Sequence, residues 1–212
     1  EAPSHLTFDH FTEEDGLCGN GITHLFQDRS GFLWIGTETG LNRYDGYSFR
    51  AYRHDKQNPS SLPSNDVFCI NEDSRGSIWV LTAKGLSKLH ADGGFETHFD
   101  SLTIQDINGN VSRMEIDAKD RIWLRCNNSL TFFDPALKRF MKATNFGATP
   151  FLDKNGGLIA FGCRFSQIDS LMHHKALRWN DLTAQFDEVK DTIVESIDYH
   201  DLNFNDGSFD GK

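Results

Sequence analysis

The side chains best suited to binding a polar ligand gather in one stretch late in the chain. Between Phe161 and Trp179 lies a locally basic group, in a chain whose formal net charge is -10: Arg164, Gln167, His173, His174, Lys175 and Arg178. Arginine guanidinium groups and aromatic rings suit polar and anionic sugars. A longer surface loop without a ligand is the simpler explanation of the same stretch. The ligand-binding candidates that follow are Arg164, His173, Arg178 and Trp179.

Catalysis has little support among these residues. The pair His173-His174 is the one cluster among nine histidines, and adjacent residues on a strand point to opposite faces. We interpret the pair as part of a solvated loop, which leaves a lyase without the His base and the metal or Lys partner that it needs. A glycosidase needs two placed carboxylates, and no pair stands out among the 31 acidic residues. The sequence therefore predicts no catalytic residue.

Metal ligands and cofactor signatures are equally weak. Asp15-Gly16 and residues 108–110 and 203–206 offer only fragments of a calcium loop, and ordinary turn chemistry explains them. The four cysteines form no CxxC pair, which argues against zinc. We expect them to be buried structural thiols: Cys18, Cys69, Cys126 and Cys163. No metal and no cofactor is predicted.

Overall charge and hydropathy exclude two further classes. A net charge of -10 and a pI near 5.3 repel a phosphate backbone, and no basic stripe offsets them, so nucleic-acid binding is not expected. No apolar run approaches the roughly 18 to 20 residues that span a bilayer. A membrane could therefore be involved only through segments that are not in this sequence.

An internal repeat organises the chain. Segments 28–34, 73–79 and 117–123 each begin with Asp and end with Trp, and they recur at a spacing of about 44 residues. A weaker copy spans 153–159 and has Ile159 in place of the Trp. We call these four segments the Asp–Trp turns. Each unit also contains short alternating apolar runs separated by Gly, Asp and Asn, the pattern of strands and tight turns.

The repeat predicts an all-β fold made of β-propeller blades, because four strands in about 44 residues is the size of one blade. We expect about four blades of four antiparallel strands, which is an incomplete propeller. The predicted ranges are a closing outer strand at 1–15, blades at 16–55, 62–100, 104–142 and 144–190, and the start of a further blade or a tail at 191–212. An arc of this kind leaves strand edges and blade faces unpaired. We therefore expect a longer propeller or a self-associating chain.

The repeated residues themselves are expected to build the fold. The Asp accepts backbone N–H groups across the turn, the Gly adopts a positive φ that Asp120 also tolerates, and the Trp fills the wedge between blades. These structural residues are Asp28, Gly31, Trp34, Asp73, Gly76, Trp79, Asp117 and Trp123. Sialidase Asp boxes place one residue between Asp and Gly, whereas this chain has two, which argues against a glycosidase of that type.

Segments 28–37 and 40–46 are similar to the two-component regulator propeller repeat almost residue for residue. The second and third units match less fully, and the fourth departs from the pattern. The resemblance implies the periplasmic sensor region of a Bacteroides-type hybrid two-component system histidine kinase. Such regions sense oligosaccharides released from glycans, and they precede a membrane helix and the kinase.

From this resemblance we expect a non-catalytic, extracytoplasmic sensor that recognises a glycan-derived oligosaccharide and signals to a downstream histidine kinase. The kinase itself would lie outside this fragment. Expected partners are the oligosaccharide and either a homodimer or further blades of the same chain. A propeller scaffold for protein–protein interaction is the alternative, and a propeller glycosidase or lyase is third.

Overall fold

A computed structural model describes residues 9–98, 111–126, 129–144, 148–165 and 172–188. These residues form sixteen β-strands and one short 3-10 helix, η1 (Glu13–Asp15), and the strands assemble into four antiparallel sheets of four strands each. Each sheet follows the chain in order, from the first strand of a unit to the last. The all-β prediction of four-stranded blades is therefore confirmed.

The sheets are numbered as blades along the chain. Blade 1 contains β1 (Ile22–Gln27), β2 (Leu33–Thr37), β3 (Gly40–Tyr44) and β4 (Phe49–Tyr52); blade 2 contains β5 (Val67–Glu72), β6 (Ile78–Thr82), β7 (Gly85–Leu89) and β8 (Phe95–His98). Blade 3 contains β9 (Val111–Ile116), β10 (Ile122–Cys126), β11 (Ser129–Asp134) and β12 (Arg139–Lys142); blade 4 contains β13 (Ala148–Leu152), β14 (Leu158–Phe165), β15 (Met172–Asn180) and β16 (Gln185–Glu188).

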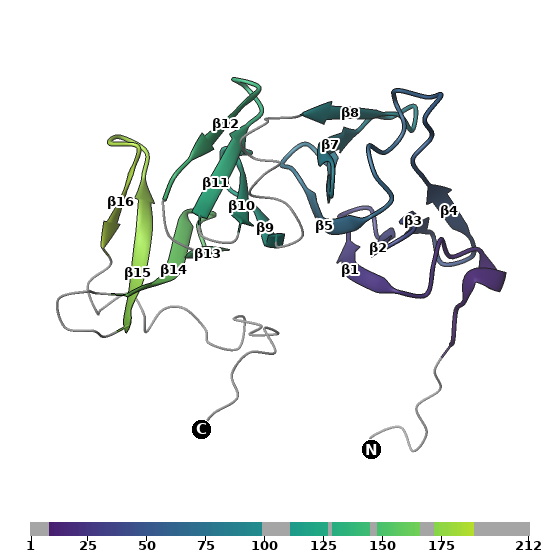
Figure 1. The fold of residues 1–212 in the computed structure, drawn as a ribbon, viewed down its shortest axis with the longest axis horizontal. Helices are drawn as coiled ribbons and strands as arrows, with labels where there is room; N and C mark the ends of the chain where they lie inside the picture. The colour runs from purple at the N-terminus through teal and green to yellow at the C-terminus, as the bar shows by residue number, and fades with distance from the viewer. Residues whose placement is uncertain (1–8, 99–110, 127–128, 145–147, 166–171, 189–212) are drawn as a thin grey trace, which may run out of the picture.

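The blades stand side by side in chain order along an arc that does not close into a ring (Figure 1). The first strands of neighbouring blades contact one another, β1 with β5, β5 with β9, and β9 with β13. The arc is thus open between blade 1 and blade 4, as the incomplete propeller predicted. None of the described residues belongs to a helix with the length and apolar character that a bilayer crossing requires.

The buried apolar side chains of the described residues form three clusters, each between two neighbouring blades. Trp34, Leu41 and Tyr52 of blade 1 pack against blade 2, and a second cluster joins blades 2 and 3 around Trp79. A third joins blades 3 and 4 around Trp123. Middle strands such as β6 are buried on both faces because a blade lies on each side of them. Their sequences are therefore apolar throughout rather than alternating.

The first three Asp–Trp turns close in the same way. One carboxylate oxygen of the Asp accepts the backbone N–H groups two and four residues later, at 2.8–3.0 Å. The other oxygen accepts the indole N–H six residues later, at 2.8 Å from Trp34, 3.0 Å from Trp79 and 2.9 Å from Trp123. The positive φ falls on Gly31 (89°), Gly76 (81°) and Asp120 (60°), as predicted.

Blade 4 keeps the turn but changes its partner. Asp153 still accepts the N–H groups of Asn155 and Gly157, at 2.9 and 2.8 Å. Ile159 has no indole, and the Arg178 guanidinium, on the strand beside it, lies 3.1 Å from the free oxygen of Asp153. In blade 4 an ion pair with Arg178 thus takes the place of the indole N–H bond to this carboxylate.

The extra length of the fourth unit forms a long hairpin. β14 and β15 pair from Ile159 and Arg178 to Phe165 and Met172, so the insertion extends two strands. The prediction of a solvated loop around His173-His174 is wrong, because both residues belong to β15. Cross-strand hydrogen bonding satisfies the backbone of this segment, which the local polar composition did not indicate.

Parts of three predicted ranges fall outside the described residues. These parts are 1–8 of the closing strand at 1–15, 104–110 at the start of the third blade, and all of 191–212. Residues 9–12 form no strand, and the segment continues into η1, which Thr12 caps by accepting the N–H of Glu14 at 3.2 Å. The division into these ranges stays a prediction.

The two cysteines whose side chains are described, Cys18 and Cys69, are buried thiols. Burial raises the pKa of the Cys18 thiol, because it penalises the thiolate. Its backbone N–H donates to the Asn42 amide oxygen at 3.0 Å. Cys18 is therefore part of the packing of blade 1, as expected of a structural thiol. The side chains of Cys126 and Cys163 lie outside the described part.

Candidate functional site

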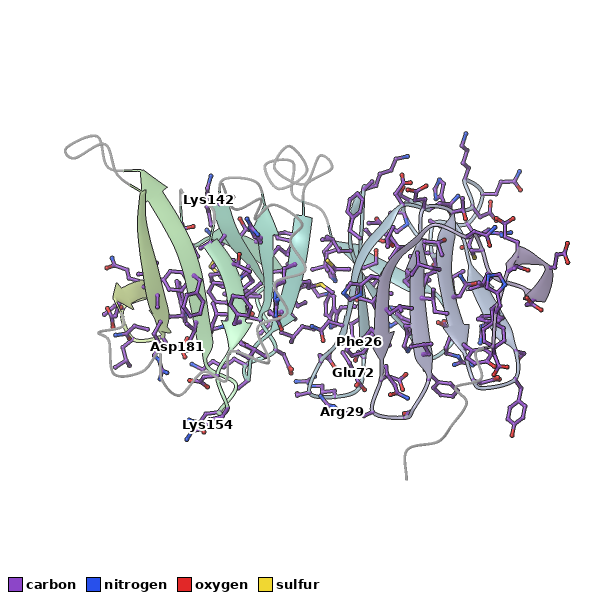
Figure 2. The ribbon with its side chains drawn as sticks, turned by 90° about the horizontal axis from the view of Figure 1, so that it is seen from below. Phe26, Arg29, Glu72, Lys142, Lys154 and Asp181 are labelled. Carbon is purple, nitrogen blue, oxygen red and sulfur yellow. The ribbon has the colours of Figure 1, made fainter. Side chains whose placement is uncertain are left out.

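A row of polar contacts links each Asp–Trp turn to the next blade. The residue after the Asp donates its backbone N–H across the interface in all three cases. Arg29 donates to the Glu72 carboxylate at 3.0 Å, Ser74 to Asp120 at 2.8 Å, and Ala118 to the Gly156 carbonyl at 3.1 Å. We call these contacts the inter-blade latches. Figure 2 shows Arg29, Glu72, Lys154 and Asp181 along one edge of the arc, with Lys142 at the opposite edge.

The junction between blades 3 and 4 contains an additional charged cluster. The Arg121 guanidinium donates to Asp117 of its own turn and to Asp181 of blade 4, and Lys119 lies 2.7 Å from the same Asp181. The Arg121 guanidinium also lies over two indole rings, 5.6 Å from the ring centroid of Trp123 and 5.8 Å from that of Trp179. Burial alone lowers the pKa of Arg121, but its two carboxylate partners outweigh this and raise it. The cluster clamps the irregular fourth blade onto the third.

Two of the predicted ligand-binding residues have partners within this framework. Trp179 donates its indole N–H to Asp181 at 3.0 Å and packs edge-on against Trp123, with ring centroids 5.0 Å apart. Arg178 pairs with Asp153. Trp179 therefore helps to close the blade 3–4 junction, whereas Arg178 holds a turn within blade 4, and the binding role of both side chains stays a prediction.

The other two candidates lie at the far end of the same hairpin. Arg164 and His173 are directly paired across β14 and β15, and their backbone alone is described. His173 and Arg178 are five positions apart on β15, which is about 16 Å at the usual rise per residue. The structure thus brings the four candidates together in two pairs rather than in one site.

A hollow of about 350 Å³ lies on the face of blade 1 that points away from blade 2. Its apolar lining consists of Phe11, Leu17, Ile22, Leu25, Ile35 and Phe49, and His10, Thr12 and Asn20 supply its polar atoms. None of the described residues that line it is Asp, Glu, Lys or Arg. This lining suits an apolar or aromatic group more than a charged one. We call it the blade-1 hollow.

The sequence reasoning missed the residues that hold the blades together. Glu72 and Asp120 each lie next to or within an Asp–Trp turn, where they look like ordinary turn residues. Arg121 stands where the other turns have Phe32 and Ser77, and this difference was the available signal. Phe11 was assigned to a strand, and its place in a hollow could not be inferred without the geometry of the blade face.

The architecture defines the chain as a series of β-propeller blades, and comparison with known proteins identifies the type of repeat. Residues 16–39 and 61–84 match the family described as two component regulator propeller. The chain therefore carries two-component regulator propeller repeats, as predicted from the Asp–Trp turns.

Individual relatives agree with this assignment. Histidine kinase P4 of Formosa agariphila is 39% identical over 59 residues, which is 28% of this chain and 4% of that protein. The extracellular domain of the putative one component system BT4673 from B. thetaiotaomicron has a TM-score of 0.58 at 18% identity, over 81% of this chain and 22% of that one. The Dos1 propeller has a TM-score of 0.57 at 13% identity, over 78% and 46%. The chain thus spans only 4% of the length of this histidine kinase and less than half of each solved structure, and the two structures support the propeller fold.

Proposed function

We propose that this chain is part of an extracytoplasmic, periplasmic sensor that recognises a glycan-derived oligosaccharide and signals to a downstream histidine kinase. The observation that carries the proposal is the match of two blades to the two-component regulator propeller repeat. The similarity of 59 residues to a histidine kinase supports the link to signalling. A structural neighbour described as an extracellular domain is consistent with the location.

The commitment of the repeated carboxylates supports a non-catalytic role. Asp28, Asp73, Asp117 and Asp153 each accept two backbone N–H groups through one oxygen and a side-chain donor near the other. A carboxylate held in this way cannot move to act as an acid, a base or a nucleophile without opening its turn. The residues that repeat most strongly are therefore structural, and a binding function fits the chain better than a reaction.

Within this proposal, the hairpin of β14 and β15 is the first place to look for the ligand. It is the part of the fold that departs from the repeat, and it carries the paired positions Arg164 and His173. Insertions in repeat proteins often provide the binding face. The guanidinium and imidazole groups would bind hydroxyl or anionic groups of a sugar.

Calorimetric titration of the 212-residue chain with a panel of oligosaccharides tests the proposal. The panel contains neutral, uronate-containing and sulfated oligosaccharides, with free monosaccharides as the negative arm. We expect saturable binding of at least one oligosaccharide, and a loss of about tenfold or more in Arg164→Ala, since hydrogen bonds to a charged group are worth about 1.5–3 kcal/mol. Arg139→Ala, which replaces an exposed arginine at the start of β12, is the matched control and should bind normally.

Two results would count against the proposal. If no oligosaccharide in the panel binds to the folded chain, sugar recognition by these blades is wrong. If a sugar binds and Arg164→Ala and His173→Ala both leave its affinity unchanged, the hairpin is not the site. The circular dichroism spectrum of each variant establishes that it is folded before its affinity is compared.

A further inference from the structure

One position between the blades is occupied by a tyrosine at the first junction and by a histidine at the second. Tyr52 ends β4 and is paired with the second residue of β3, and its ring lies 6.0 Å from that of Trp34 at 28°. His98 ends β8 and is paired with the second residue of β7, and its ring lies 5.7 Å from that of Trp79 at 32°. The backbone position and the ring contact are thus the same. Tyrosine, however, stays neutral up to about pH 10, whereas histidine titrates near pH 6.5.

The His98 ring packs against two aromatic residues of the cluster that joins blades 2 and 3. Besides Trp79, it contacts Phe133 of blade 3, with ring centroids 4.6 Å apart, and the Trp79 and Phe133 rings are 5.8 Å from each other. Trp79 and Phe133 are each 1% exposed, and the His98 side chain is 12% exposed. A positive charge on the imidazole would therefore be placed among apolar rings, with little water to solvate it.

Glu96 is the carboxylate that could stabilise a charged His98, and it already has other partners. Its Oε1 atom is 3.9 Å from the His98 Nε2 atom and 2.8 Å from the Nζ atom of Lys138, on the turn between β11 and β12. Its Oε2 atom is 3.7 Å from the His90 Nε2 atom. The Glu96 side chain is 38% exposed, so solvent screens its attraction for the ring. Lys138, which ties blade 3 to this carboxylate, is closer to it than His98 is.

The other charged groups around His98 do not compensate for its burial. Burial is the strongest influence and lowers the pKa of His98, while Glu96 acts to raise it. Three basic side chains lower it further, namely Lys138, Lys88 and His90. On the facing strand, one carboxylate oxygen of Asp134 accepts the N–H groups of residues 136 and 137 in its own turn, at 2.9 and 3.2 Å. The neutral ring is therefore the form that the folded junction favours.

We propose that His98 is an acid-sensitive switch between blades 2 and 3, in which the neutral ring holds the two blades together and a proton on the ring loosens them. The proton creates a cation beside the aromatic cluster. The charged ring then competes with Lys138 for the Oε1 atom of Glu96, which weakens an ion pair between the blades. The junction of blades 1 and 2 lacks this response at the same position, because Tyr52 stays neutral. Neither a sugar nor a kinase takes part, so a failure of the proposed function would leave this switch untouched.

NMR of the His24→Asn chain tests the switch, because this background removes the histidine that bonds blade 1 to blade 2. The His98 ring resonances are followed over roughly pH 5 to 8, the range in which histidine changes charge. Hydrogen-exchange protection factors are measured for the N–H groups of Ser74, which donates from blade 2 to blade 3, and of Arg29, which donates from blade 1 to blade 2. We expect the ring to titrate below about pH 6.5. The protection of Ser74 should fall with the same midpoint, while that of Arg29 stays constant.

Two substitutions assign the effect to the ring. His98→Tyr places at the second junction the residue type of the first, and it should abolish the pH dependence of Ser74 protection. His90→Tyr is the matched control, because His90 contacts the same carboxylate but is 48% exposed. It should leave the pH dependence in place.

Three results would contradict the switch. A His98 ring that titrates at or above about pH 6.5 would show that Glu96 and the aromatic faces stabilise its charged form. Constant Ser74 protection while the ring titrates would show that the charge does not loosen the junction. An equal effect of His90→Tyr and His98→Tyr would place the pH response at the exposed side of Glu96. The first two results are obtained with His98 unmodified, so they decide the question even if a tyrosine does not fit there.

Discussion

Replacing Asp73 by Asn tests whether the Asp–Trp turn is held by its carboxylate. One oxygen accepts the N–H groups of Arg75 and Ser77, at 3.0 and 2.8 Å, and the other accepts the Trp79 indole N–H at 3.0 Å and the Lys88 ammonium at 3.3 Å. The side chain is 4% exposed. An Asn oxygen can keep the two backbone bonds, but its amide then turns a donor toward the indole and the ammonium.

The expected cost follows from the groups left without an acceptor. A buried indole N–H that loses its partner costs about 1–3 kcal/mol. The partly exposed Lys88 contact adds no more than about 1 kcal/mol, because solvent screens it. We therefore expect Asp73→Asn to lower the free energy of unfolding by about 3 kcal/mol. With a urea m-value of roughly 2–3 kcal/mol/M, the midpoint falls by about 1 M.

Urea unfolding followed by circular dichroism measures this change, with Asp92→Asn as the matched control. Asp92 accepts one N–H, from Gly94 at 2.9 Å, in an exposed turn that Asn can also form, so its replacement should cost less than about 0.5 kcal/mol. Trp79→Phe completes a double-mutant cycle, whose coupling energy with Asp73→Asn should exceed about 1 kcal/mol. Equal midpoints for the two Asn variants, or a cycle without coupling, would refute the reasoning.

The pH dependence of the same variant gives an independent reading. Burial alone raises the pKa of Asp73, but the bonds from Ser77, Trp79 and Lys88 outweigh it and hold that pKa below its usual value. A carboxylate with a lowered folded-state pKa contributes stability above its unfolded pKa, about 3.9, and loses it as the pH falls through the folded value. The gap between wild type and Asp73→Asn should therefore close below about pH 4.

Three further predictions concern contacts between blades. Burial lowers the pKa of His24, and its neutral ring accepts a backbone N–H of blade 2 at 3.2 Å. The stability of the protein should therefore fall as the pH drops below about 6.5, the pKa of an unfolded His. His24→Asn keeps an acceptor and should remove this contribution to the pH dependence of thermal unfolding. A Cβ on Gly36 would lie 2.8 Å from a side-chain carbon of Val67 in blade 2. Gly36→Ala should therefore lower the free energy of unfolding in urea by about 1–3 kcal/mol. Gly21→Ala, whose Cβ would make only ordinary contacts, should lower it by less than about 0.5 kcal/mol. Arg121→Met removes the cation that Asp117 and Asp181 share at the blade 3–4 junction and should cost about 2–3 kcal/mol in urea unfolding. The exposed Lys119→Met should cost less than about 1 kcal/mol, and equal losses would show that the Arg121 contacts are unimportant.

The repeated turns could be predicted from the sequence because their requirements are local. An Asp that accepts nearby N–H groups and a positive φ at Gly31 or Gly76 depend on a few neighbouring residues, so the pattern alone indicates them. The bond from the indole to the same Asp was not foreseen. It depends on how β1 and β2 lie across the turn, which the spacing of six residues allows without requiring.

The contacts between blades could not be predicted because they join residues far apart in the chain. Arg29 and Glu72 are 43 positions apart, and neither departs from what an exposed turn would contain. The role of Arg178 was also hidden, because the loss of the Trp at Ile159 is visible in the sequence while its replacement by a cation from β15 is not. The hairpin around His173 was misread because polar residues on paired strands resemble those of a loop.

The packing of each hydrophobic cluster between two neighbouring blades determines how far the effect of a destabilising mutation extends. Each hydrophobic cluster spans two adjacent blades, so the stability of the arc is close to a sum of single-blade terms and nearest-neighbour coupling terms. A destabilising mutation in one blade should lower the stability of the blades beside it strongly and that of more distant blades weakly. A change in the stability of one blade is therefore passed to the next blade only through the free energy of the interface between them.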